Sequence, residues 1–212
     1  MNRQGPSLLL ENLGGKDGGA WPGGCIRVSG SHEDERRSNR KGRARMGHKG
    51  TEERKKEAGE KAYNYENQYH CCSQATLLAL QEVLGLEDEL ALKAASSLCG
   101  GVALSGKTCG ALTGGVMAIG MKHGRGDLKE GFASVLKAML PANKLVRWFE
   151  SEFGSTVCRD ISGLEVTEEV LKMMMANPEA ALKSLDPKMV EKCSQICRRT
   201  AEKVIEILEG QS

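Results

Sequence analysis

The chain has 212 residues and a formal net charge of +2, and aromatic residues make up only 4% of it. So small a net charge argues against a basic nucleic-acid-binding surface, and no run approaches the ~20 apolar residues of a membrane span. The scarcity of aromatic residues, with plentiful Ala, Leu, Met and Gly, favours close-packed helices over a β-sandwich. We therefore expect an all-α protein with no nucleic-acid partner.

Residues 1–50 combine paired glycines with a charged stretch from His32 to Arg45. Such a composition cannot repay the entropy of ordering, so it predicts a disordered N-terminal extension. Met46 is a candidate translation start, with residues 1–45 as an upstream extension. The three leucines at 8–10 fall short of the ~7–15-residue apolar core of a signal peptide. We expect a cytoplasmic protein whose cysteines serve as metal ligands, redox thiols or core residues.

Helical patterns dominate from Thr51 onward and predict a compact helical bundle of five to seven helices over residues 51–212. After a first helix from Thr51, we expect helices at about 71–83, 87–98, 109–122 and 129–153, the last with a break at Pro141. Pro178 and Pro187 each suggest the first position of a further helix. The final helix, 188–208, places its apolar residues at helical spacing on one face.

Residues 107–114, with the sequence Lys-Thr-Cys-Gly-Ala-Leu-Thr-Gly, place Cys109 at the start of a predicted helix that Thr108 caps. The free amides and the dipole of a helix N-terminus lower the pKa of a thiol. Gly110 and Gly114 leave one helix face without side chains, so a second helix or a bound cluster could approach. They are the candidate cofactor-binding residues. The alternative is a small-residue packing stripe with Cys109 as a buried apolar residue.

The overlapping residues 101–108 match the phosphate-loop pattern G-x-x-x-x-G-K-[ST]. Such a loop requires a strand before it and a helix after it. Residues 89–99 are rich in Ala and Leu and predict a helix instead. The alternation of strands and helices that carries such loops is also missing. Nucleotide binding is therefore the least favoured function.

The other cysteines differ in what their surroundings predict. We favour Cys72 over Cys71 as a site residue, since neighbours on a helix point in different directions. Cys99 is expected in the core or a turn, and Cys158 in a short connection after the helix stop at Gly154. Cys193 and Cys197 lie one helical turn apart, and Cys197 is expected in the core.

With these residues in place, the chain resembles the C-GCAxxG-C-C family of small bacterial and archaeal proteins, which are described as redox-active. Four cysteines and a Cys-Gly-Ala-x-x-Gly motif define the family. The resemblance runs from about Tyr65 to Leu208 and places the four cysteines at Cys72, Cys109, Cys158 and Cys193. It implies a helical fold and an association with oxidoreductase or transport proteins, and it supplies no reaction.

Two classes of function follow. In the first, the protein is redox-active: Cys72, Cys109, Cys158 and Cys193 ligate an iron–sulfur cluster, or thiols such as Cys109 and Cys158 cycle with a disulfide. In the second, the same four residues form a structural zinc site. Both classes require sulfurs that are far apart in sequence to converge in space.

Overall fold

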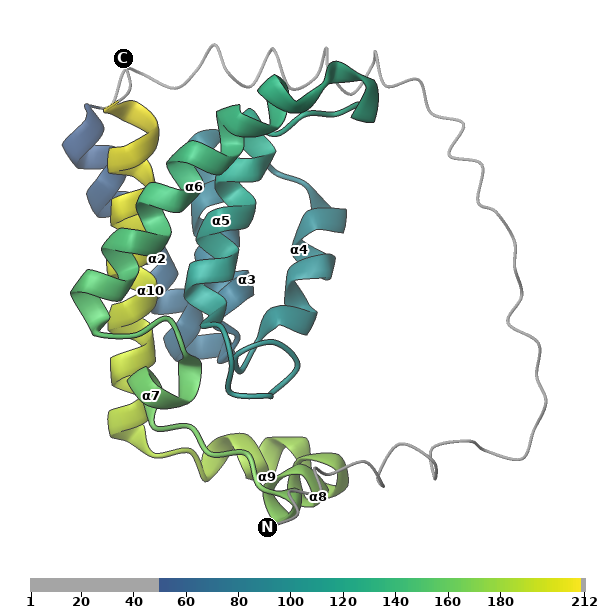
Figure 1. Ribbon diagram of the computed structural model, residues 1–212. Helices are drawn as coiled ribbons and strands as arrows, with labels where there is room; N and C mark the ends of the chain where they lie inside the picture. The colour runs from purple at the N-terminus through teal and green to yellow at the C-terminus, as the bar shows by residue number, and fades with distance from the viewer. Residues whose placement is uncertain (1–49, 211–212) are drawn as a thin grey trace. The chain divides into compact units, whose positions relative to one another are not determined.

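The computed structural model describes residues 50–210, shown in Figure 1. The predicted disordered extension, the candidate start at Met46 and the residue Cys25 therefore lie outside the described residues, apart from Gly50. The α-helices are α2 (Thr51–Tyr69), α3 (Cys72–Leu84), α4 (Glu89–Ala95), α5 (Gly110–His123), α6 (Phe132–Phe153), α7 (Cys158–Ser162), α8 (Glu168–Ala176), α9 (Pro178–Lys183) and α10 (Pro187–Glu209). Two 3-10 helices, η1 (Ser96–Leu98) and η2 (Leu128–Glu130), lie between them.

The all-α prediction is confirmed for residues 50–210, which contain nine α-helices and no β-strand. The predicted number of five to seven was too low. Seven of the nine helices have at least seven residues, and the other two, α7 and α9, span one to two turns. So short a helix has too few positions to show a hydrophobic period.

Helix ends follow the turn and cap residues of the sequence. Gly85 and Gly154 end α3 and α6 in the left-handed conformation, which a glycine adopts without a Cβ clash. Pro178 and Pro187 occupy the first turns of α9 and α10, as predicted. Pro141 does not break α6, which runs through it from Phe132 to Phe153.

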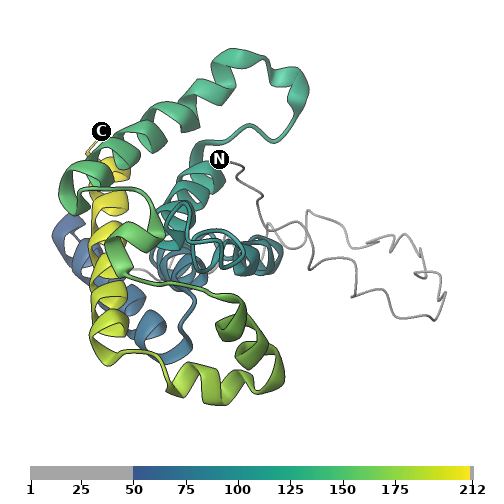
Figure 2. The same ribbon diagram turned by 60° about the horizontal axis from the view of Figure 1, so that its bottom comes forward.

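The helices bury a shared apolar core. The most extensive packing between two helices is that of α2 on α10. Helix α3 packs on both α2 and α5, and α6 packs on α5. Figures 1 and 2 show α10 beside α2 in both views. The largest fully buried side chains come from several helices, including Leu77, Leu80, Ile119, Phe149 and Ile205. Full burial of such a side chain stabilises the fold by about 1.5–3 kcal/mol.

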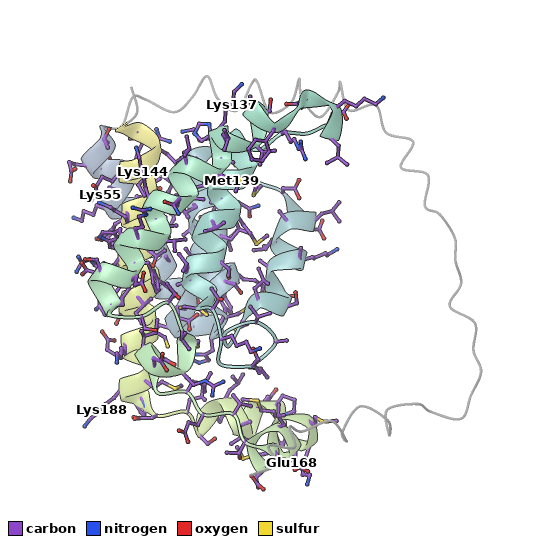
Figure 3. The ribbon with its side chains drawn as sticks, viewed as in Figure 1. Lys55, Lys137, Met139, Lys144, Glu168 and Lys188 are labelled. Atoms are coloured by element: carbon purple, nitrogen blue, oxygen red, sulfur yellow. The ribbon has the colours of Figure 1, made fainter. Side chains whose placement is uncertain are left out.

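The first half of α6 contributes little to this core. Phe132 is 68% exposed, Met139 51% and Leu140 61%. Figure 3 labels Met139 on this half of the helix, with Lys137 and Lys144 on the same helix. No helix in residues 50–210 has the length and apolar character needed to cross a membrane.

Helices α8 and α9 lie at one end of the bundle, beside the start of α10, in Figures 1 and 2. In Figure 3, Glu168 marks the first residue of α8 and Lys188 the first turn of α10. The two short helices pack on each other, and their side chains contribute to a wall of the site described below.

Candidate functional site

Three of the four family cysteines lie at helix N-termini. Cys72 is the first residue of α3, Cys109 is the N-cap of α5 and Cys158 is the first residue of α7. Two predictions need correction here. The helix after the motif begins at Gly110 with Cys109, not Thr108, as its N-cap, and Cys158 begins a short helix rather than lying in a connection. All three thiols are buried.

Gly110 and Gly114 let α5 approach the start of α3. A Cβ on Gly110 would collide with the Cys72 sulfur, and one on Gly114 would collide with the Ser73 carbonyl oxygen. A second helix thus packs on this face, as the alternative of a small-residue packing stripe also predicts, and the assignment of the two glycines to cofactor binding stays a prediction. These two glycines are what permits Cys72, at the start of α3, to approach Cys109, at the start of α5.

Cys72 is the common neighbour of the other thiols. Its sulfur accepts hydrogen bonds from two thiols, those of Cys109 and Cys99. These bonds hold the pKa of Cys72 well below its usual range, and the backbone amides of Gly100 and Ser73 lower it further. The hydrogen bond to Cys72 raises the pKa of the donor Cys109 well above normal. The two thiols therefore titrate as a coupled pair, and the directions of their pKa shifts favour the thiolate on Cys72.

The sequence analysis did not predict that Cys71 and Cys99 interact with each other and with Cys72. The Cys99 thiol donates to the His70 carbonyl at 3.6 Å and also interacts with the sulfurs of Cys71 and Cys72, which lowers the pKa of Cys71 to about 6. One S–H donates to one acceptor at a time. Cys99 divides its hydrogen bond among several acceptors, whereas Cys72 is the one thiol partner of Cys109 among residues 50–210, so Cys109 is the more constant donor to Cys72. Cys99 reaches this place because the chain after η1 turns back sharply, as the glycines at 100, 101 and 106 predict, with positive φ angles at all three.

Residues 100–104 form this turn with five consecutive positive φ angles, three of them at Val102, Ala103 and Leu104. For residues other than glycine this conformation costs about 1–2 kcal/mol each. The backbone N–H groups of residues 102–107 all donate to nearby carbonyls, from Ser97 to Val102. They are therefore not directed at a phosphate, and η1, not a strand, precedes them. The match to the phosphate-loop pattern does not have a phosphate-loop structure.

The start of α7 fixes the end of this loop. Cys158 N–H donates to the Lys107 carbonyl at 2.5 Å, and Cys109 N–H donates to the Thr156 carbonyl at 2.9 Å. The Arg159 guanidinium Nη2 donates to the Ser105 carbonyl at 3.0 Å. Main-chain bonds thus set the relative position of two family cysteines that are distant in sequence.

A cavity of about 280 Å³ opens beside these thiols. Cys72, Cys99, Cys158 and Cys193 line it, together with Glu66 near the end of α2. Cys109 is not among the lining residues, so it contacts Cys72 from outside the cavity. Most of the remaining lining consists of Leu, Met, Pro and Val side chains from α8, α9, α10 and the adjoining loops.

Cys193 and Cys197 on α10 occupy different environments. Cys193 is half-buried in the cavity wall, where burial raises its pKa to about 12. Cys197 is fully buried, as expected for a core residue, and its thiol donates to the Cys72 carbonyl at 3.8 Å. Burial raises the pKa of Cys197 well above normal, and the Cys72 charge adds to this.

Glu66 is the ionisable cavity residue that the sequence analysis did not single out. It is only 6% exposed, and its Oε2 atom has no hydrogen-bond partner among the described residues. Burial raises its pKa well above normal, and the charges of Cys72 and Cys71 add to this. The signal in the sequence is its spacing: Glu66 follows Ala58 and Ala62 on the buried face of α2.

The predicted metal ligands, Cys72, Cys109, Cys158 and Cys193, lie on four different helices or their caps. Within residues 50–210, no group of three or more His, Cys, Asp or Glu side chains could hold a metal ion as they lie. Cys72, Cys109, Cys158 and Cys193 surround one region but do not fit a preformed metal centre. Among these four cysteines, Cys72 and Cys109 are the two whose thiols are joined by a hydrogen bond.

Comparison with known proteins agrees with these cysteines. Residues 70–207 match the model of the family described as "Putative redox-active protein (C_GCAxxG_C_C)". No curated protein and no solved structure matches the chain. The matched segment begins just before Cys72 and ends within α10, so it contains all four family cysteines.

Proposed function

This chain belongs to that cysteine-motif family, and we propose that it works as a dithiol–disulfide redox protein with Cys72 and Cys109 as its redox pair. The contact between these two thiols, at the N-termini of α3 and α5, carries the proposal. Cys109 was a predicted redox thiol, and Cys72 takes the place of Cys158 as its partner. The Cys158 sulfur has the Ser162 hydroxyl as its polar neighbour and affects the pKa of Cys109 through its charge.

The geometry supports a division of roles within the pair. A thiolate, rather than a thiol, is the attacking species in disulfide exchange. Cys72 holds the thiolate and lines the cavity, so it attacks a substrate disulfide and forms a mixed disulfide. Cys109 then attacks the Cys72 sulfur and releases the second substrate thiol. One substrate disulfide is thereby reduced to two thiols, while two protein thiols lose two electrons and form one disulfide.

Disulfide mapping after mild oxidation tests this proposal. Hydrogen peroxide oxidises Cys72 to a sulfenic acid and releases water, and Cys109 then displaces a second water to form the disulfide. We expect mass spectrometry to find a Cys72–Cys109 link and the Cys109→Ser variant to lose it. Cys25→Ser, outside the described residues, is the control and should keep it. A link between Cys71 and Cys99 in its place would contradict the proposal.

Ligation of an iron–sulfur cluster or of zinc by Cys72, Cys109, Cys158 and Cys193 stays a prediction. Thiolates suit both kinds of centre. Metal analysis and the visible absorbance of anaerobically purified protein test it directly. A stoichiometric metal that is lost in Cys158→Ser and Cys193→Ser would favour a metal centre over the dithiol.

A further inference from the structure

We propose that the cavity beside Cys72 binds small, uncharged, apolar molecules that carry a disulfide, and that Glu66 protonates the sulfur that leaves. The inference rests on the proposed dithiol function and names the substrate class of that site. Cys72 and Glu66 both line the cavity, so a bound disulfide would have the attacking sulfur and a proton donor within one enclosure.

The cavity wall selects for apolar molecules. Its aliphatic and thioether side chains come from six segments of the chain: Leu104, Leu164, Met174, Leu182, Leu185 and Met189. Methionine side chains adapt to irregular shapes, which suits a wall built on two short helices. Among the described lining residues there is no Lys or Arg. A charged disulfide would lose its hydration here, and His70 is the one basic side chain among the described lining residues.

Glu66 gives this apolar enclosure a polar group with an unmet hydrogen bond. An unsatisfied buried polar atom costs about 1–3 kcal/mol, and such atoms in a folded protein call for an explanation. Glu66 lines the cavity, and the buried Oε2 atom of its carboxyl has no hydrogen-bond partner among residues 50–210. Its raised pKa keeps the carboxyl protonated, so it can donate a hydrogen bond. A ligand sulfur would be its partner.

The exchange balances with these groups alone. The Cys72 thiolate bonds to one sulfur of the ligand, whose S–S bond breaks, and the other sulfur leaves and takes the Glu66 proton. Cys109 then bonds to Cys72 and displaces the first ligand sulfur, which takes the Cys109 proton. The ligand has gained two electrons and two protons, and one negative charge has moved from Cys72 to Glu66. A thiol reductant later restores the pair, and solvent returns the Glu66 proton.

Binding is measured first in a variant that cannot react. In the double variant Cys72→Ser, Cys109→Ser, we expect isothermal titration to show binding of lipoamide, an uncharged cyclic disulfide, and none of charged glutathione disulfide. Adding Leu185→Lys should weaken lipoamide binding roughly tenfold or more, because it places a charge in the wall. The matched control, Leu140→Lys, changes an exposed leucine on α6 and should leave binding unchanged. Met174→Trp, which fills the cavity, provides a second test if Leu185→Lys does not fold.

The proton donor is tested in the reactive protein. We expect Glu66→Gln to slow oxidation of the reduced protein at saturating lipoamide, with little change in lipoamide affinity. Glu66→Asp, which keeps a carboxyl, should restore part of the rate. A loss of affinity with an unchanged saturating rate would show that Glu66 only shapes the cavity, and would overturn its assigned role.

The outcomes separate this inference from the dithiol function. If peroxide links Cys72 to Cys109 but lipoamide neither binds nor oxidises the protein, the substrate class is wrong and the redox pair stands. If peroxide forms no such link, the redox pair is wrong, and binding to the inert variant still decides what the cavity accepts. Oxidation by an apolar quinone but not by lipoamide would also overturn the disulfide class.

Discussion

The close approach of α5 to α3 makes a sharp prediction at two glycines of the same helix. A Cβ on Gly114 would collide with the Ser73 carbonyl oxygen and lie 3.2 Å from its carbon, whereas one on Gly120 would meet nothing within 4 Å. Both changes to alanine gain the same helix propensity, about 1 kcal/mol, so this contribution cancels between them. The remaining difference is the cost of overpacking, about 1–3 kcal/mol.

We therefore expect Gly120→Ala to raise the free energy of unfolding by about 1 kcal/mol. Gly114→Ala should have an unfolding free energy about 1–3 kcal/mol below that of Gly120→Ala, because backbone atoms cannot rotate away from the new methyl group. Urea denaturation under reducing conditions, followed by circular dichroism, measures both. The same shift of α5 should separate Cys72 from Cys109 and slow their oxidation by peroxide. Equal stability of the two variants would refute the described packing.

Three further predictions concern the thiols and the loop before them. Closing the chain between Cys72 and Cys109 should stabilise the oxidised protein by about 4 kcal/mol through loop entropy, which urea denaturation of the oxidised and reduced forms would show. Lys107→Ala should leave folding and the redox signal unchanged, since the Lys107 side chain is exposed; a nucleotide affinity that depends on Lys107 would contradict this. Alkylation of Cys71 by iodoacetamide should rise as the pH passes about 6 and then level off, because the thiolate forms above the lowered pKa. In Cys99→Ala, which removes the hydrogen bond, the rise should move to higher pH.

The helical fold was within reach of the sequence because its signals are local. Glycines and prolines mark helix ends through the backbone of one residue, as at Gly85 and Pro187. The break expected at Pro141 was wrong because the helix tolerates the missing bond. Pro141 has no N–H to donate to the carbonyl of Lys137, so one hydrogen bond of the helix is missing. Lys137 is exposed, so its carbonyl is accessible to water.

The candidate site was only partly predictable because its essential contacts are non-local. The motif around Cys109 identified the cysteine and its neighbouring glycines, but not which thiol would meet it. That partner, Cys72, is brought to Cys109 by the way α3 crosses α5. The left-handed turn separately brings Cys99 back to Cys72. Glu66 was missed because a single acidic residue in a helix rich in charged residues is expected to face solvent. Its burial depends on the packing of other helices on α2, which the local sequence does not show.

The pairing of α2 with α10 also sets the order in which the centre matures during synthesis. These helices stand at opposite ends of the described residues, and α10 leaves the ribosome after every cysteine of the earlier helices. Until α10 docks, the α2 face that carries Ala58, Ala62 and Glu66 lacks one of the two described helices that pack closely on α2, so Glu66 is less shielded from water and its carboxyl ionises more readily. Cys193 is also not yet in place as part of the wall. The proposed redox centre therefore becomes competent only after translation has passed α10, so a truncated chain would carry the motif without its enclosed cavity.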